Sequence, residues 1–462
     1  MSGDVRFSAE EVSRATGAAP VSGAEEDRFV GVSIDSRTVR PGQLFVAIRG
    51  KHFDGHDFIG QARARGAVGA VVERLAQAVG LKGLPVWVVP DSVAALGDLA
   101  GFHRQRFEVP VIAVTGSSGK STTKMMLAHL LSATRNVLAT PGTQNNRIGV
   151  PLTLFHLGES HQAVVLEMGT NLWGEIRRLT EIARPTLGVV TNIGPAHLET
   201  FGNLHGVLWA KGELWEQMEL EASLVLNADD PMLWEEGQRL KRRIIWFGRH
   251  PKADVRADDI VCGQAETRCV VNGQWEMRVP LAGQHNLMNA LAALAAAQVL
   301  GEPLAAATER IADVQPMPGR LSFSEQDGLL VIDDTYNANP RSLKAALEVL
   351  TGVERSGRRV VVVGDMLELG EQAERLHAEA GRWMVEYGVD FLVAVGPLVR
   401  RLLGSAWEFG LPRGRGRGFD TPEEAGEFLS SFVRRGDALL LKGSRGMQME
   451  RVLACFTISS TR

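Results

Sequence analysis

A glycine-rich segment at residues 114–123 has the residue types and spacing of a phosphate-binding loop. It reads Val-Thr-Gly-Ser-Ser-Gly-Lys-Ser-Thr-Thr and overlaps the end of the apolar run 111–115. Glycines let the backbone N–H groups turn toward phosphate oxygens, and a following helix adds positive potential. Lys120 is spaced to reach the terminal phosphates of a nucleotide, and Ser121 to ligate Mg²⁺. Because Val114 occupies the position of the usual first glycine, the segment predicts a variant loop. The expected nucleotide contacts are Thr115, Gly116, Ser117, Ser118, Gly119, Lys120, Ser121 and Thr122.

Further polar residues follow apolar runs downstream. Glu167 ends the run 163–166, where a strand's carboxyl end meets a ligand crevice, and a carboxylate there suits Mg²⁺. A solvated strand end is the alternative. His197 follows the run 187–191 and is equally compatible with an ordinary loop histidine. Taken alone, Lys211 is typical of an exposed lysine.

Two asparagines begin an alanine-rich segment, 287–300, which predicts a helix. Asn286 has the type and position of a helix cap, and Asn289 lies on the same helical face. Capping explains the first asparagine but not the second.

The last third of the chain begins with Gly-Arg at 319–320 and a polar run, 332–340, after a predicted strand. Asp334 is placed to hold a ribose hydroxyl and Asn337 an adenine edge. A helix cap with a turn is the alternative for this run.

Apolar runs separated by helical stretches predict an α/β protein with three domains. The first, 1–107, reads as a small α/β unit. The second, 108–317, reads as a central domain with a mostly parallel sheet, followed by a strand-rich insert at about 253–281 that contains an Asn-Gly hairpin turn. The third, 318–462, reads as a Rossmann-like, doubly wound domain, and Pro-Met-Pro-Gly at 316–319 predicts a hinge before it.

Composition excludes several classes of protein. The 462 residues contain 50 Lys and Arg and 54 Asp and Glu, and this lack of a basic surplus argues against a nucleic-acid-binding protein. Three cysteines are too few for a disulfide framework and indicate reduced thiols. The acidic N-terminus lacks the apolar core of a signal peptide, and no apolar run is long enough to cross a membrane. We therefore expect a cytoplasmic protein without membrane insertion, and we expect the arginine-rich tract 413–418 to be an exposed loop.

Taken together and in order along nearly the whole chain, these segments resemble the Mur ligase family of ATP-dependent amide-forming enzymes. The segments that carry the resemblance are 33–37, 54–56, 145–151, 167–171, 334–340 and 364–370, together with the phosphate-binding loop. Within the family they are similar to the member that joins D-alanyl-D-alanine to UDP-N-acetylmuramoyl-tripeptide. The resemblance implies ATP, two Mg²⁺ ions, both of these substrates and a monomer.

The resemblance also assigns roles to residues. It implies that Glu167 and His197 are Mg²⁺ ligands, and that Lys211 reacts with CO₂ to form a carbamate that holds a second Mg²⁺. It places Asn286 and Asn289 near adenine and Arg320 at the γ-phosphate. The residues implied for the UDP-linked substrate are Ser33, Asp35, Ser36, Arg37, Asp54, Gly55, His56, Asn145 and Asn146. The implied first domain binds the UDP group.

Two other functions stay open at this point. A sibling ligase of the same family adds a single amino acid instead of a dipeptide. A nucleotide-binding regulatory module without ligase chemistry is the alternative from another class, although it leaves the first domain and Arg320 without a role.

Overall fold

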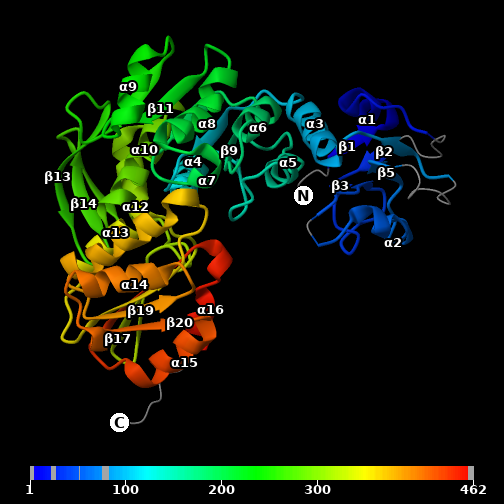
Figure 1. Ribbon diagram of the computed structural model, residues 1–462. Helices are drawn as coiled ribbons and strands as arrows, with labels where there is room; N and C mark the ends of the chain where they lie inside the picture. The colour runs from blue at the N-terminus through cyan, green and yellow to red at the C-terminus, as the bar shows by residue number, and fades with distance from the viewer. Residues whose placement is uncertain (1–4, 22–27, 51, 75–82, 456–462) are drawn as a thin grey trace.

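A computed structural model describes residues 5–21, 28–50, 52–74 and 83–455. It shows four sheets, arranged as an N-terminal α/β domain, a large middle domain and a C-terminal domain (Figure 1). The middle and C-terminal domains lie against each other, and the N-terminal domain projects to one side of the middle domain. None of the helices in the described ranges combines the length and hydrophobicity needed to cross a membrane.

The N-terminal domain has a four-stranded parallel sheet and a separate antiparallel strand pair. Its strands are β1 (Arg6–Ser8), β2 (Arg28–Val30), β3 (Val32–Ser33), β4 (Leu44–Val46), β5 (Gly69–Val72) and β6 (Val86–Val88), and its helices are α1 (Ala9–Thr16), α2 (Ile59–Ala64) and α3 (Ser92–Arg104). Helix α3 packs on α5 and α6 of the middle domain. Arg104 fastens this junction, since its guanidinium donates to the carbonyl oxygens of Ala183, Phe107 and Val109.

The middle domain is built on a nine-stranded sheet in the order β15-β14-β13-β12-β11-β10-β7-β9-β8. Its strands are β7 (Val111–Thr115), β8 (Val137–Ala139), β9 (Ala163–Glu167), β10 (Leu187–Val190), β11 (Ser223–Asn227), β12 (Ile244–Gly248), β13 (Val255–Cys262), β14 (Thr267–Val271) and β15 (Trp275–Val279). Strands β8 to β13 and β7 pair in parallel, and β14 and β15 add antiparallel strands. The insert expected at 253–281 therefore extends the main sheet instead of forming a separate unit.

Strand β7 lies at the topological switch point of this sheet, because the next strands of the chain are added on one side of it and the later ones on the other. Its neighbours are β9 on one side and β10 on the other. All five of its residues are buried, as expected of a parallel strand covered on both faces. The crevice at the carboxyl end of such a strand is where open α/β sheets bind ligands.

Helices cover both faces of the middle sheet. They are α4 (Lys120–Ser132), α5 (Gly149–Leu154), α6 (Glu175–Ala183), α7 (Leu198–Phe201), α8 (Leu204–Gln217), α9 (Pro231–Arg239), α10 (Gln284–Val299) and α11 (Leu304–Arg310). Helix α10 packs directly on α4, because its many alanines allow close approach. It begins after Gly283, so the sequence-based interpretation of Asn286 as the helix cap is wrong.

The C-terminal domain has a six-stranded sheet in the order β16-β17-β21-β18-β19-β20. Its strands are β16 (Ser322–Gln326), β17 (Leu329–Asp334), β18 (Arg359–Gly364), β19 (Phe391–Val395), β20 (Gly416–Phe419) and β21 (Ala438–Lys442), and its helices are α12 (Pro340–Thr351), α13 (Ala373–Glu386), α14 (Val399–Glu408), α15 (Pro422–Phe432) and α16 (Glu450–Ala454). All pairs except β16 with β17 are parallel. The arginine-rich tract is exposed, but its second half is the edge strand β20 and not a loop.

Helices α13 and α14 pack closely at Gly381, where an added Cβ would overlap the carbonyl oxygen of Leu402. We expect Gly381→Ala to lower the free energy of unfolding of this domain by about 1–3 kcal/mol, because extra volume in a packed interface forces the backbone apart. Thermal and chemical denaturation measure the change. Gly404→Ala on α14 is the matched control, since nothing lies within 4 Å of its Cβ position. Equal stability of the two variants would show that the helices are not packed this closely.

Candidate active site

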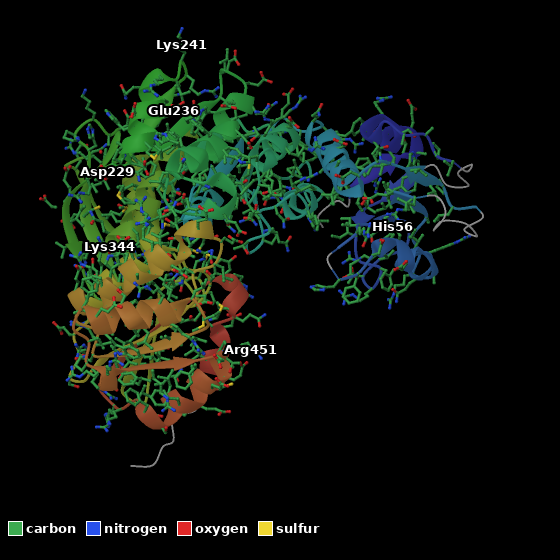
Figure 2. All side chains as sticks on the ribbon, viewed as in Figure 1. His56, Asp229, Glu236, Lys241, Lys344 and Arg451 are labelled. Carbon is green, nitrogen blue, oxygen red and sulfur yellow. The ribbon has the colours of Figure 1, made fainter. Side chains whose placement is uncertain are left out.

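A cleft of about 800 Å³ lies between the middle and C-terminal domains. Figure 2 shows Asp229 and Lys344, which line it from the two domains, and places His56 far away in the N-terminal domain. Most of the expected nucleotide and metal residues line this cleft: Ser117, Ser118, Gly119, Lys120, Ser121, Thr122, Glu167, His197, Asn286, Asn289, Arg320, Asp334 and Asn337. Two of the residues expected for the UDP-linked substrate, Asn145 and Asn146, line it as well. The fold thus brings together side chains that follow or end strands β7, β9, β10 and β17, and side chains from helices α4 and α10.

The phosphate-binding loop has backbone angles that only glycine adopts easily. Gly116 has φ 143° and Gly119 φ 82°. An added Cβ on Gly119 would overlap the side-chain oxygen of Asn289, so the loop also fits closely against α10. Asn289 in turn donates to Asn286 at 3.3 Å. Asn289 therefore packs against the phosphate-binding loop, and Asn286 accepts a hydrogen bond from Asn289.

The two serines of the loop fasten it to the segment that follows β10. The Ser117 hydroxyl donates to the carbonyl oxygen of Gly194 at 2.9 Å, and the Ser118 hydroxyl donates to Asn192 Oδ1 at 3.1 Å. The Lys120 ammonium donates to the Gly116 carbonyl oxygen at 3.0 Å, and burial lowers the pKa of Lys120. The loop is thus preorganised with its lysine folded back across it.

Glu167 is 1% exposed, which rules out the solvated strand end. Its Oε1 accepts a hydrogen bond from Asn145 Nδ2 at 2.7 Å, while Oε2 is buried without a hydrogen-bond partner. The Lys124 ammonium is 3.8 Å from Oε2 and donates to the Thr140 and Gly142 carbonyl oxygens. Sequence reasoning missed Lys124, although its position one helical turn after Lys120 was a usable signal.

His197 lies at the start of α7, in the left-handed conformation with φ 52°. Its Nδ1 is 2.6 Å from Glu368 Oε2 of the C-terminal domain. The imidazole lowers the pKa of Glu368. The histidine therefore joins the two domains at one end of the cleft.

Lys211 lies on α8, is 2% exposed and does not line the cleft, so the expectation of an exposed lysine is wrong. Burial and the nearby charge of Lys120 together lower its pKa well below the ordinary value. No group in the described residues accepts a hydrogen bond or forms an ion pair with its ammonium. It is a buried amine close to the phosphate loop.

The C-terminal domain contributes Arg320 to the same loop. Its Nη2 donates to the Ser121 hydroxyl at 2.8 Å, and its guanidinium lies 4.1 Å from the ring centroid of Tyr336. Arg341, which the sequence analysis did not single out, donates to the Ile193 carbonyl oxygen at 3.2 Å. These contacts close the C-terminal domain onto the nucleotide loop.

Asp334 and Asn337 both make internal hydrogen bonds. The Lys442 ammonium is 2.5 Å from Asp334 Oδ2 and also donates to the Asn337 carbonyl oxygen at 2.9 Å. Burial raises the pKa of Asp334 against the opposing effect of Lys442. Asn337 Oδ1 accepts from the backbone N–H of Arg445 at 3.2 Å. Contacts of these two residues with ribose and adenine stay predictions.

In the N-terminal domain, several of the expected substrate residues likewise make internal hydrogen bonds or ion pairs. Asp35 forms an ion pair with Arg37 at 2.8 Å, which lowers the pKa of Asp35 to about 2. His56 is buried, and its Nδ1 is 2.6 Å from Asp54, which caps the turn that begins at Gly55. The Ser36 hydroxyl donates to Gln61, and the Ser33 hydroxyl to the Asp35 carbonyl oxygen. Direct substrate contacts by this set stay predictions.

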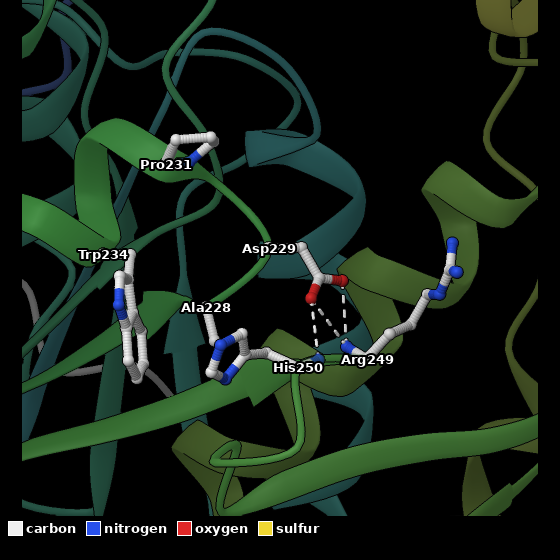
Figure 3. Close-up of a pocket in the computed structure, with 6 residues that line it drawn as sticks. All are labelled: Ala228, Asp229, Pro231, Trp234, Arg249 and His250. Carbon is white, nitrogen blue, oxygen red and sulfur yellow. Dashed lines mark hydrogen bonds between the residues drawn. The ribbon is translucent and has the colours of Figure 1, made fainter.

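A second, shallower hollow of about 540 Å³ adjoins the cleft at the ends of β11 and β12. Figure 3 shows its Asp229 carboxylate accepting hydrogen bonds from the backbone N–H groups of Arg249 and His250. Trp234 lies against His250, with ring centroids 4.3 Å apart. The Asp229 carboxylate thus holds the turn after β12, whereas the expected nucleotide and metal residues line the cleft instead of this hollow.

Fold and site together define a nucleotide-dependent enzyme whose phosphate loop is completed by an arginine from a second α/β domain. Three family models match the chain: the Mur ligase catalytic domain over residues 28–104, the Mur ligase middle domain over 114–297, and the Mur ligase glutamate ligase domain over 319–445. The chain belongs to the Mur ligase family.

Two relatives are similar in sequence to this chain along nearly their full length. UDP-N-acetylmuramoyl-tripeptide–D-alanyl-D-alanine ligase of Escherichia coli is 36% identical over 440 residues, which cover 93% of this chain and 94% of the relative. The ligase of the same name from Bacillus subtilis is 32% identical, with 93% of each chain covered.

Two solved structures have the same three-domain fold. Crystal structure I of MurF from Acinetobacter baumannii has a TM-score of 0.89 and 33% identity, with 98% of this chain and 99% of that chain covered. MurF ligase from Thermotoga maritima in complex with ADP has a TM-score of 0.82 and 32% identity, with 92% and 96% covered.

Proposed function

We propose that this chain catalyses ATP-dependent amide-bond formation between UDP-N-acetylmuramoyl-tripeptide and D-alanyl-D-alanine. The observation that carries the proposal is the position of Arg320 on Ser121, which sets the C-terminal domain directly over the phosphate loop and Lys120. Relatives with this ligase name that match over nearly the whole chain support the choice of substrates.

The reaction has two balanced steps. An oxygen of the peptide's terminal carboxylate attacks the γ-phosphorus of ATP, the bond to the β–γ bridging oxygen breaks, and ADP leaves. The amine of the dipeptide then attacks the carbonyl carbon of the acyl phosphate, inorganic phosphate leaves, and the amine loses a proton. Phosphorylation is needed because a carboxylate oxygen is a poor leaving group.

The residues at the loop act on the first step by stabilising charge. Lys120 of the middle domain and Arg320 of the C-terminal domain both line the cleft, and their positive charges would act on the terminal phosphate. Charge stabilisation and positioning are the main contributions that a protein makes to phosphoryl transfer. Closure of the C-terminal domain also excludes water, which would hydrolyse the acyl phosphate.

The donor set at Glu167 fits Mg²⁺. Its buried Oε2 has no hydrogen-bond partner, and the Ser121 hydroxyl lines the same cleft, so both are hard oxygen donors. The described residues contain no cluster of three His, Cys, Asp or Glu side chains suited to a metal. Magnesium sites commonly use one or two protein ligands together with substrate phosphates. When bound, the ion would neutralise phosphate charge during transfer.

A panel of amine substrates tests the proposal. With ATP and UDP-N-acetylmuramoyl-tripeptide present, we expect D-alanyl-D-alanine to support ADP release at least about 100-fold faster than glutamate, lysine or diaminopimelate, since buried polar groups that lose their partners discriminate at that level. A coupled ADP assay and mass spectrometry of the product measure this. Faster turnover with a single amino acid would favour the sibling ligase, and ATP turnover without any UDP-linked peptide would favour the regulatory module. The cytoplasmic location and the monomeric state stay predictions.

A further inference from the structure

Two large apolar side chains stand exposed beside the cleft. Leu172 is 58% exposed and Trp173 is 49% exposed, and they follow Asn171, which lines the cleft. The Trp173 ring packs edge to face with Phe201, with ring centroids 5.0 Å apart. The ring of Phe201 lies in turn 6.3 Å from the ring of His197, measured between centroids. Phe201 therefore connects Trp173 to His197, which lines the cleft.

The backbone of this turn is held rigidly. The Glu175 carboxylate accepts from the backbone N–H groups of Asn171 at 2.7 Å and of Leu172 at 3.0 Å. The Thr170 hydroxyl donates to the Leu172 carbonyl oxygen at 2.8 Å. On the far side, Glu213 of α8 accepts from the N–H of Gly174 at 2.7 Å. Single exposed apolar residues are ordinary, but here an adjacent pair is fixed in place by hydrogen bonds from both sides.

The turn that carries Leu172 and Trp173 lies near the junction between the N-terminal and middle domains. Helix α6 begins at Glu175, after the single residue Gly174 that follows the pair. It contacts α3 of the N-terminal domain through an ion pair between Arg178 and Asp98 at 2.5 Å. Figure 1 shows α6 between the N-terminal domain and the rest of the middle domain. The turn before α6 therefore lies near the junction of the N-terminal and middle domains, and its residues Asn171 and Glu175 line the same cleft as Lys120.

We infer that Leu172 and Trp173 bind the aliphatic part of the UDP-linked peptide, close to the carboxylate that is activated. The inference rests on the proposed function. A solved relative is named for a substrate that contains alanyl and 2,6-diaminopimelate residues, which carry methyl and methylene groups. Burial of such groups against a preformed apolar surface contributes binding energy without ordering cost in the protein.

This contact acts on binding and not on the chemical step. It is made equally in the ground state and in the transition state, so its loss raises KM and leaves kcat unchanged. For Trp173→Ala we expect the KM for UDP-N-acetylmuramoyl-tripeptide to rise about tenfold, which corresponds to about 1.4 kcal/mol. The KM values for ATP and D-alanyl-D-alanine stay as in the wild type, and Trp173→Phe restores most of the affinity.

Trp209→Ala is the matched control, because Trp209 is 62% exposed on α8 and does not line the cleft. Titration of the UDP-linked peptide without ATP supplies a second readout: we expect it to change the tryptophan fluorescence of the wild type and of the Trp209 variant, and to leave the Trp173→Phe variant nearly unchanged.

Several results would overturn the inference. An active wild type whose KM for the UDP-linked peptide is the same in Trp173→Ala overturns the inference alone, and so does an equal rise of KM for all three substrates. Loss of a dimer in Trp173→Ala, seen by analytical ultracentrifugation with unchanged KM, shows a subunit contact instead. A wild type that forms no ADP with all three substrates overturns the proposed function as well.

Discussion

Lys120→Ala is expected to slow ADP formation by about 100- to 1,000-fold with all three substrates present. Removing one preorganised charge-stabilising group from a phosphoryl-transfer or acyl-transfer site typically has that effect, equivalent to about 2.7–4 kcal/mol of transition-state stabilisation. The Lys120 ammonium is held over the loop by its bond to the Gly116 carbonyl oxygen, so it is already positioned when the nucleotide arrives. Steady-state kinetics with a coupled ADP assay measures the loss.

The fold of this variant should survive, because it removes a buried cation whose pKa burial has already lowered. We expect its thermal unfolding midpoint to stay within about 4 °C of the wild type, a shift of less than roughly 1 kcal/mol in a domain of this size. Lys241→Ala, at an exposed position in the same domain, is the control and should keep full activity (Figure 2). If Lys120→Ala binds nucleotide and keeps full activity, the phosphate-binding loop does not stabilise the transition state through Lys120.

The phosphate loop and the strand ends were predictable because their signals are local. The order of glycines, Lys120 and Ser121 after a buried run specifies a strand, a turn and a helix start, and Glu167 ends a second such run. The parallel sheet follows from the alternation of apolar runs with helical stretches. The structure confirms these elements and brings their polar ends to one cleft.

Other features were not predictable because tertiary packing decides them. Strands β16 and β20 are polar edge strands, so their sequences lack the apolar run that marks a buried strand. The Lys442 ammonium pairs with Asp334 across 108 residues, and no pattern in the chain connects the two. Arg341 reaches the middle domain only because the C-terminal domain is closed onto it.

Lys211 illustrates the same limit, because its sequence surroundings on α8 are typical of an exposed lysine. The structure instead buries Lys211 about as deeply as Lys442, and the two lysines differ in their partners. Lys442 has the Asp334 carboxylate and a carbonyl oxygen as acceptors, whereas the Lys211 ammonium has no acceptor among the described residues. An unpaired buried ammonium is costly, so burial and the charge of Lys120 favour the neutral amine of Lys211.

A neutral amine is the form that reacts with CO₂: the nitrogen bonds to the carbon, one proton is released, and a carbamate forms. That product has the oxygen donors a second Mg²⁺ requires. We therefore expect Lys211→Ala to lower the rate of ADP formation by at least about 100-fold, the size of effect seen when a charge-stabilising group is lost. Wild-type protein that is acidified and returned to neutral pH under CO₂-free gas should be inactive, and bicarbonate should restore it.

Carbon-13 NMR of protein incubated with labelled bicarbonate separates modification of Lys211 from a structural role of the lysine. We expect a carbamate resonance in the wild type and in Lys120→Ala, and none in Lys211→Ala. Lys442 acts as an internal control, because its nitrogen already donates to Asp334 and to the Asn337 carbonyl oxygen. Activity that is independent of CO₂, together with a spectrum that lacks the resonance, would mean that Lys211 acts as an amine.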